Sequence, residues 1–443
     1  MVSLERVSWA GLDEEARARA IARASLARPD DGDDVATAVR SIGAEVRRRG
    51  DGALFELTER FDGACLESLR VADDEIAAAT GAIDVEDRDC LARALKNIQA
   101  FHRLQRSRSV ELETEPGVWC RRVSRPVDRV GLYVPGGTAP LVSTLLMLAV
   151  PARLAGCRER IVCTPPGRDG RVNANVLAAA ELCEVTAVFK VGGAQAVAAM
   201  AYGTETIARV DKIFGPGNAY VAAAKQLVSS EPGGVAIDLP AGPSEVLVIA
   251  DDSAEPAFVA ADLLSQAEHD ETAQVLLVTP SSSLADRVEH ELTSQLAGLP
   301  RRAIAELALS GARVIVVRDL SQAVDVSNVY APEHLILNCD GADELVESVR
   351  HAGSVFVGPW SAEAFGDYAS GTNHVLPTYG HARAFGGLTL ESFSKTMTVQ
   401  RLTEKGVEGL GPTVERLARL EGLEAHARAV GVRRKVLARE VSE

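Results

Sequence analysis

Four separated stretches of the chain carry side chains that can bind a metal ion and transfer protons. They are Ser265-Gln266-Ala267-Glu268-His269, Ala331-Pro332-Glu333-His334, Gly366-Asp367-Tyr368-Ala369-Ser370-Gly371 and Glu421-Gly422-Leu423-Glu424-Ala425-His426. A structural zinc site usually closes with four ligands in short Cys and His spacings, whereas a catalytic site draws ligands from distant segments and leaves room for substrate. The wide spread of these stretches therefore predicts a catalytic zinc site.

One pair of candidate ligands lies on a helix that we predict over residues 255–269. Gln266 and His269 are three residues apart, so they share one helix face and can reach a single ion. Taken alone, such a pair is more often a solvated helix end. Asp367 in its glycine-rich loop and His426 near the start of the last predicted helix are equally ambiguous by themselves.

Glu333 and His334 open a predicted strand over residues 334–337, directly after Pro332. Alternation along a strand would point the two side chains to opposite sides unless the turn distorts them. A histidine beside a carboxylate offers a general base and a second proton acceptor in one place. A charged strand entry would look the same locally, so the pair gains meaning only in combination with the other stretches.

Bulk properties favour a small-molecule partner. The net charge of −15 argues against nucleic acid or an anionic membrane, because both select for clustered Lys and Arg. Seven cysteines without CxxC spacing favour reduced thiols in the cytoplasm over a disulfide framework. The N-terminus lacks the apolar core of a signal peptide, and no run reaches the roughly 18 to 20 apolar residues of a membrane span.

Short apolar runs alternate with helical stretches in two series, which predicts an α/β fold with parallel sheets. The first series is VGLYV, RIVCT, TAVFKV and VDKIFG, and the second is EVLVIA, QVLLVT, RVIVVR and HLILNC. Residues 1–48 and the chain after about residue 385 look helical. We therefore expect two incomplete Rossmann-like parallel-sheet domains with N-terminal and C-terminal helical segments.

Three glycine turns close strands of the first series and lead into helices, namely Val134-Pro135-Gly136-Gly137-Thr138, Val191-Gly192-Gly193-Ala194-Gln195 and Phe214-Gly215-Pro216-Gly217-Asn218. Glycine lets the backbone approach a ligand, and the helix N-terminus attracts a pyrophosphate. The Rossmann fingerprint is missing, because Tyr220 stands where its third glycine would be. A single turn of this kind is more often an ordinary connection between a strand and a helix. Three of them at the carboxyl ends of strands favour a ligand site.

Long strings of the chain resemble the histidinol dehydrogenase family. The resemblance runs from about Leu54 to His426 and includes GLYVPGGTAPLVSTLLMLAVPA, GPGNAYVAAAK, AIDLPAGPSEVLVIAD, DLLSQAEHD, APEHL and GDYASGTNHVLPT. It implies a zinc-dependent oxidation of L-histidinol through L-histidinaldehyde to L-histidine, with two NAD and one water, as the last two steps of histidine biosynthesis. It also implies a cytoplasmic, domain-swapped homodimer.

The resemblance assigns roles residue by residue. It implies zinc ligands at Gln266, His269, Asp367 and His426, the last from the neighbouring subunit, and an acid/base pair at Glu333 and His334. It implies substrate contacts at Ser244, His374 and Glu421, besides Gln266, His269, His334, Asp367 and His426, and NAD contacts at Tyr133, Gln195 and Asn218. The domains expected are a helical arm (1–28), a discontinuous α/β domain (29–129 with 245–385), an NAD-binding domain (130–244) and a C-terminal helical segment (386–443).

Three alternatives stay open against this interpretation. A thiohemiacetal route through Cys120 or Cys157 is disfavoured, because neither has an adjacent activating residue in sequence. A paralogue that oxidises another small alcohol, such as a sulfonated diol, would not be expected to keep Glu421, which suits an ammonium group. A catalytically inactive zinc-binding scaffold would not be expected to keep Glu333, His334 and every matched ligand.

Overall fold

The computed structural model describes residues 2–23, 32–136, 141–239 and 242–440. Internal contacts divide the chain into two compact units, Met1–Gln105 with Asp128–Ser392, and Arg106–Val127 with Phe393–Glu443. Each unit is described by itself.

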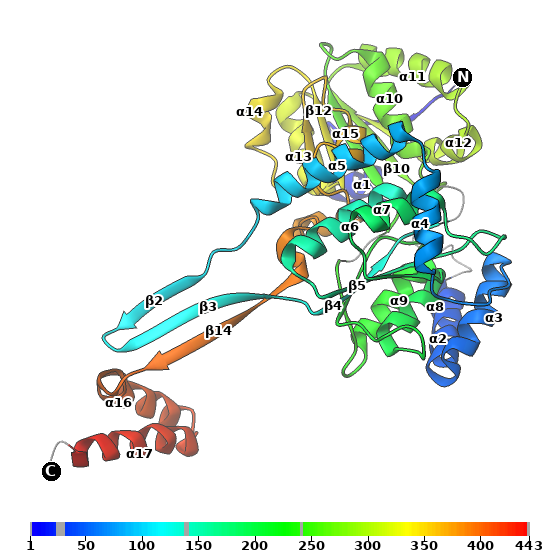
Figure 1. Cartoon of the computed structure of the whole chain (residues 1–443). Coiled ribbons are helices and arrows are strands. Elements are labelled where there is room, and N and C mark those ends of the chain that lie inside the picture. The colour runs from blue at the N-terminus through cyan, green and yellow to red at the C-terminus, as the bar shows by residue number, and fades with distance from the viewer. Residues whose placement is uncertain (1, 24–31, 137–140, 240–241, 441–443) are drawn as a thin grey trace. The chain divides into compact units, whose positions relative to one another are not determined.

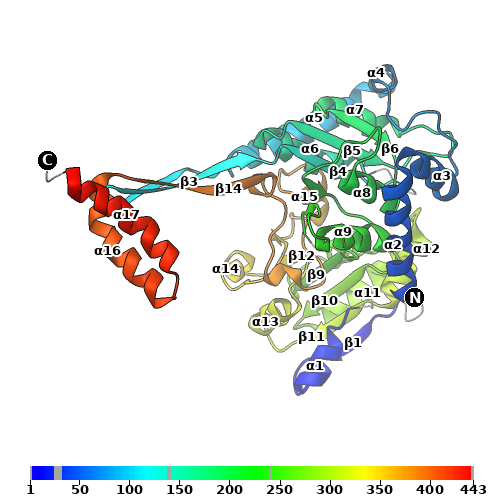
Figure 2. The same cartoon turned by 90° about the horizontal axis from the view of Figure 1, so that it is seen from below.

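A six-stranded sheet forms the core of one half of the first unit (Figures 1 and 2). All of its pairings are parallel, in the order β1-β11-β10-β9-β12-β13. The strands are β1 (Glu5–Ser8), β9 (Glu245–Ala250), β10 (Gln274–Thr279), β11 (Arg313–Val316), β12 (His334–Asn338) and β13 (Ser354–Val357). The central strands are almost wholly apolar because helices cover both faces of the sheet.

Six helices pack against the six-stranded sheet through two separate apolar clusters, one on each face. These helices are α1 (Glu14–Ala20), α10 (Pro256–Ala267), α11 (Ser282–Leu296), α12 (Arg302–Ser310), α13 (Leu320–Tyr330) and α14 (Ala342–Val346). The short helix α15 (Glu363–Tyr368) lies against α10. Two short 3₁₀ helices follow, η1 (His381–Arg383) and η2 (Leu390–Phe393).

A second parallel sheet in the first unit has the order β6-β5-β4-β7-β8. Its strands are β4 (Arg129–Tyr133), β5 (Glu159–Thr164), β6 (Ala187–Lys190), β7 (Lys212–Phe214) and β8 (Ala236–Ile237). Its helices are α2 (Gly32–Arg49), α3 (Asp51–Asp62), α4 (Asp73–Ala82), α5 (Val85–Arg103), α6 (Val142–Ala155), α7 (Ala174–Leu182), α8 (Gly193–Tyr202) and α9 (Ala219–Ser230). Two parallel-sheet assemblies with helices confirm the predicted fold class.

The second unit is an antiparallel ribbon followed by a helical hairpin (Figure 1). Its strand order is β14-β3-β2, from β2 (Val110–Glu115), β3 (Val118–Pro126) and β14 (Ser394–Leu402). The hairpin consists of α16 (Glu404–Leu420) and α17 (Glu424–Glu440). None of the helices in the described part of the chain combines the length and apolar character that crossing a membrane requires.

Two expectations of purely helical ends were wrong. Glu5–Ser8 forms β1, which joins the edge of the six-stranded sheet, and Ser394–Leu402 forms β14. Both strands are largely exposed, so they lack the apolar runs that mark the other strands. Their partners lie hundreds of residues away, at β11 and β3. The predicted domain boundaries at residues 28, 129, 244 and 385 stay a prediction.

Asp62, the last residue of α3, is expected to make the stability of the fold depend on pH. Burial raises the pKa of the Asp62 carboxyl from 3.8 to about 6, and its Oδ2 has no hydrogen-bond partner among the described residues. A raised folded-state pKa makes ionisation destabilising, so this cost grows as the pH rises from about 4 to about 6. A carboxylate at a helix C-terminus is also unfavourable.

We expect Asp62→Asn to raise the free energy of unfolding at pH 8 by about 1 kcal/mol after allowance for solvent screening, and to change it little at pH 4. Thermal unfolding at the two pH values measures this difference. The exposed Asp325 in α13 supplies the control substitution, Asp325→Asn, which should show no such pH dependence. Equal effects of Asp62→Asn at both pH values would contradict the explanation.

Candidate active site

The predicted acid/base pair lies where α13 turns into β12. The helix ends at Tyr330, and Ala331 takes a left-handed conformation with a φ of 56°, its N–H bonded to the Ser327 carbonyl at 2.7 Å. Glu333 is therefore still outside the strand, which begins at His334. The expectation that the two side chains point apart does not hold, because Glu333 Oε2 lies 3.7 Å from His334 Nδ1.

The main chain of Glu245, the first residue of β9, holds both side chains. Its N–H donates to Glu333 Oε2 at 2.9 Å, and its carbonyl oxygen lies 3.0 Å from His334 Nδ1. Because a carbonyl oxygen only accepts, Nδ1 must carry the proton in the neutral ring, which leaves Nε2 with its lone pair. Burial lowers the pKa of His334 to about 4, and the charge of Asp367 opposes that shift only in part. His334 is thus a neutral base at physiological pH.

Asp367 faces the free nitrogen of His334 from a short helix. Its Oδ1 lies 3.7 Å from His334 Nε2, and Glu363, one turn earlier on α15, places Oε1 3.5 Å from His334 Nδ1. One ligand atom from each of His334, Glu363 and Asp367 lies within 4.8 Å of the others. Carboxylate oxygens and an imidazole nitrogen are suitable ligands for zinc.

Several polar atoms of this site have no hydrogen-bond partner among the described residues. They are His334 Nε2, both oxygens of Glu363, and the oxygen and nitrogen of the Gln266 amide. Burying such groups without a partner is costly. Burial, reinforced by Asp367 and Glu333, raises the pKa of Glu363 well above its usual range, and burial also raises that of Asp262 to about 7. A bound cation would pair with the Gln266 amide oxygen and offset the charge of the carboxyl groups, while His334 Nε2 stays free to accept a proton.

The predicted helical ligand pair is found on α10 and the turn that follows it. Gln266 is fully buried, and His269 is exposed with Nδ1 2.8 Å from the Ser265 carbonyl oxygen. By the argument used for His334, Nε2 of His269 is left as the ligand atom. The charge of His269 also lowers the pKa of His334 and His374, so it lies within electrostatic reach of both.

The predicted substrate contacts fall into two groups. His374 Nδ1 lies 2.8 Å from the Asp367 carbonyl oxygen, and its Nε2 lies 3.4 Å from Thr144 Oγ1. Ser244 directly precedes β9, and its carbonyl accepts the N–H of Gln274 at 2.9 Å. His426 and Glu421 belong instead to the second unit, on α17 and at the end of α16, where both are exposed.

The predicted cofactor contacts follow three strands of the five-stranded sheet. Tyr133 ends β4, and its hydroxyl accepts the N–H of Gly193 at 3.1 Å. Gln195 is buried in the first turn of α8, and Asn218 caps α9 by accepting the N–H of Val221 at 3.1 Å. Residues Gly137 and Thr138 of the first glycine turn lie outside the described residues.

Gly215 shows why a glycine turn is needed beside these residues. Its φ is 120°, and a Cβ there would lie 2.1 Å from the Tyr133 carbonyl oxygen. Lys225 Nζ donates to the Gly215 carbonyl at 2.9 Å, and Asp238 accepts the Gly215 N–H at 2.7 Å. The backbone at the end of β7 is thus held against that of β4.

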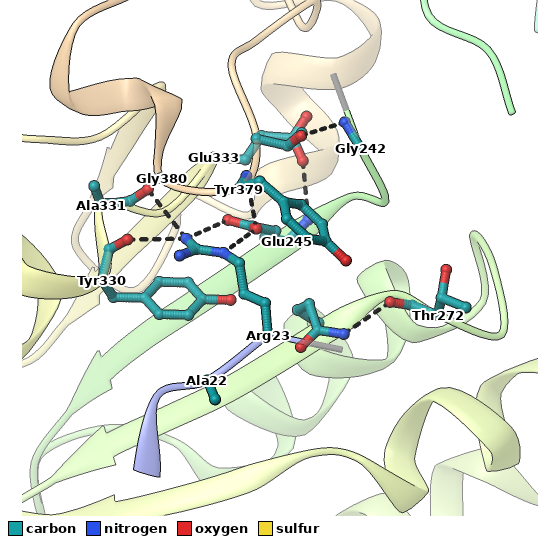
Figure 3. Close-up of polar contacts among 12 residues, drawn as sticks. Ala22, Arg23, Gly242, Glu245, Thr272, Tyr330, Ala331, Glu333, Tyr379 and Gly380 are labelled. Carbon is teal, nitrogen blue, oxygen red and sulfur yellow. Dashed lines mark hydrogen bonds and ion pairs between the residues drawn. The ribbon is translucent and has the colours of Figure 1, made fainter. Parts of the chain in front are cut away.

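The sequence interpretation missed four residues that bear on the site: Arg23, Glu245, Asp262 and Glu363. Glu363 could have been found, since it precedes Asp367 by four residues and so shares its helix face. Asp262 has the same relation to Gln266. Arg23 gave no signal, because its contacts with Glu245 and Tyr330 span more than 200 residues (Figure 3).

Comparison with known proteins supplies the family. A model described as histidinol dehydrogenase matches residues 26–434. The histidinol dehydrogenase of Xanthomonas euvesicatoria pv. vesicatoria is 53% identical over 98% of this chain and 99% of that protein, and the one of Vibrio cholerae is 51% identical over 97% and 98%. The crystal structure of histidinol dehydrogenase from Elizabethkingia anophelis has a TM-score of 0.93 and 44% identity, covering 98% of this chain and 99% of that one. The chain therefore belongs to the histidinol dehydrogenase family, a family of oxidoreductases.

Proposed function

We propose that this protein oxidises L-histidinol to L-histidine through bound L-histidinaldehyde, with zinc and two NAD, as the last two steps of histidine biosynthesis in the cytoplasm. Its relatives at about half identity over nearly the whole chain are named histidinol dehydrogenase. The observation that carries the proposal is the group of unpartnered buried polar atoms beside Asp367, within a chain of this family.

Gln266, His269, Asp367 and His426 would hold the zinc ion. The amide oxygen of Gln266 is buried without a partner among the described residues, and His269, with Nδ1 directed at the Ser265 carbonyl, offers Nε2. His426 would come from the second unit of a partner subunit, so that two chains complete each site of a homodimer. Zinc, when bound, supplies a Lewis-acidic anchor for the imidazole and amino nitrogens of the substrate.

His334 is the group that would take the hydroxyl proton in the first oxidation. Its Nε2 is buried, unprotonated and free to accept, and its low pKa keeps it neutral. Glu333 would take a proton from the water that hydrates the aldehyde. Burial raises the pKa of Glu333 well above the usual range, and a carboxylate with a raised pKa is a stronger base. Glu421 would pair with the substrate ammonium group, while Ser244 and His374 would contact the substrate.

Tyr133, Gln195 and Asn218 would contact NAD, which supplies the hydride acceptor for both oxidations. Tyr133 ends β4, and Gln195 and Asn218 follow β6 and β7, so all three lie at the carboxyl ends of parallel strands. Ligands of open α/β sheets bind at such ends. The N-termini of α8 and α9, which begin shortly after β6 and β7, suit the pyrophosphate.

The first test is the yield of NADH per L-histidinol consumed by the purified protein. We expect two NADH per substrate, with activity lost after chelation and regained with zinc, because the metal anchors the substrate for both hydride transfers. One NADH per substrate would contradict the four-electron reaction. Turnover of another small alcohol, such as a sulfonated diol, without turnover of histidinol would favour the paralogue.

The second test concerns the sharing of sites between subunits. Asp367→Ala and His426→Ala should each abolish activity when expressed alone. Co-expression of the two chains should restore about a quarter of wild-type activity, because half of the randomly paired dimers would be mixed and would contain one intact site of two.

Co-expression of Asp367→Ala with His269→Ala supplies the matched control. Both changes fall in the first unit, so no pairing of these chains yields an intact site and activity should stay absent. Failure of the Asp367→Ala and His426→Ala mixture to recover, with mixed dimers demonstrated by differently tagged chains, would mean that His426 serves its own chain.

A further inference from the structure

A buried ion pair between Arg23 and Glu245 lies next to Glu333 (Figure 3). The guanidinium of Arg23, in the segment that follows α1, donates through Nε and Nη2 to the two carboxylate oxygens of Glu245, the second at 2.9 Å. The side chain of Glu245 is 0% exposed and that of Arg23 is 14% exposed. Two-pronged contacts of this kind fix orientation as well as charge.

Arg23 is also bound to the end of α13. Nη2 donates to the Tyr330 carbonyl at 2.9 Å and lies 3.4 Å from that of Ala331, and the guanidinium carbon stands 3.8 Å from the centre of the Tyr330 ring. Ala331 is the left-handed residue that precedes Pro332 and Glu333. Arg23 therefore joins the two segments that define the acid/base pair, the start of β9 and the entry to β12.

Glu245 acts on the pair through its main chain while its side chain is held by Arg23. Its N–H binds Glu333 Oε2 and its carbonyl accepts from His334 Nδ1, at 2.9 and 3.0 Å. The carboxylate also accepts the N–H of Tyr379 at 2.8 Å, and Tyr379 has a φ of 54°. A non-glycine residue in this region costs energy and persists only where its surroundings hold it.

An ordinary structural explanation would make the ion pair a tether for the N-terminal segment. Arg6 and Glu289 form such a tether, with Arg6 Nη2 at 2.7 Å from Glu289 Oε2, between β1 and α11. Among the described residues, that pair makes no hydrogen bond or ion pair with Glu333, His334 or Glu245. The Arg23 pair differs because its acidic partner orients both predicted proton-transfer groups, and because a second contact reaches the residue before Pro332.

We propose that Arg23 and Glu245 are positioning residues for the oxidation, which keep Glu333 Oε2 and the Nδ1–H tautomer of His334 in place. This inference rests on the proposed function, which gives Glu333 and His334 their roles. Loss of the Arg23 contacts lets the start of β9 and the Ala331 turn shift, so the proton acceptors are misplaced. The predicted metal ligands Gln266, His269 and Asp367 make no hydrogen bond or ion pair with Arg23 among those found in the described residues.

The test compares Arg23→Met, Arg23→Lys and Arg6→Met in the full-length enzyme, with kcat, KM for L-histidinol, bound zinc and the thermal unfolding temperature as readouts. We expect Arg23→Met to lower kcat by about 10- to 100-fold while KM and zinc content change less than about threefold, because misplaced groups slow the chemical step. Arg23→Lys keeps the positive charge but cannot make the two parallel hydrogen bonds of a guanidinium group, so it should retain an intermediate kcat. Arg6→Met should lower the unfolding temperature and leave kcat unchanged.

A lowered unfolding temperature with unchanged kcat in the Arg23 variants would overturn the proposal. Arg23 would then only attach the N-terminal segment to the rest of the unit. If Arg23→Met does not fold, Arg23→Lys and Glu245→Gln decide the question by the same criterion. Absence of histidinol oxidation in the wild-type enzyme would instead reject the proposed function, so the two failures are told apart by the wild-type control.

Discussion

Burial of carboxyl groups around one imidazole is the constraint on which the site depends. Desolvation raises the pKa of Glu333 and Glu363, and the negative charge of Asp367 adds to the shift in both. Like charges held this closely destabilise one another unless protons or a cation offset them. One main-chain hydrogen bond, from the Glu245 N–H, partly offsets the cost of burying Glu333. The Gln266 amide oxygen and both Glu363 oxygens have no hydrogen-bond partner among the described residues. A metal ion bound through the Gln266 oxygen and Asp367 would offset the negative charge of these carboxyl groups.

The six-stranded sheet supplies the rigid frame for these charges. The parallel register pairs His334 with Val246, so the entry of β12 lies beside the first residue of β9. Because both strands are buried on both faces, neither can slip without exposing its apolar side chains. The register therefore keeps Glu245 beside the entry of β12, and a small shift of Glu245 at the end of its strand would move Glu333 and His334 together. Two catalytic candidates that are adjacent in sequence are held by one residue that is almost 90 positions away.

The elements with long apolar runs could be predicted from the sequence, because their burial on both faces leaves a local signal. The helix α10 differs from the predicted span of residues 255–269 by one residue at its start and two at its end. The strands β1 and β14 could not be found this way, since they are exposed and held by distant partners. For the site, residue types and family resemblance gave the candidate ligands. The bond between Arg23 and Glu245 and the convergence of Glu333 and His334 depend on tertiary contacts that no local pattern encodes.

Main-chain carbonyl groups set the protonation of three histidines in the same way. Nδ1 of His269 faces the carbonyl of Ser265, that of His334 faces Glu245, and that of His374 faces Asp367, at 2.8 to 3.0 Å. In each neutral ring the proton must then reside on Nδ1, which leaves Nε2 as the acceptor or ligand atom. A side-chain partner could titrate or rotate away, whereas a carbonyl in a helix or at a strand entry cannot lose its acceptor character. The folded backbone thus prepares the nitrogen lone pairs before any substrate or metal ion arrives, and a change that displaces one of these carbonyls would alter the chemistry of a histidine it does not otherwise touch.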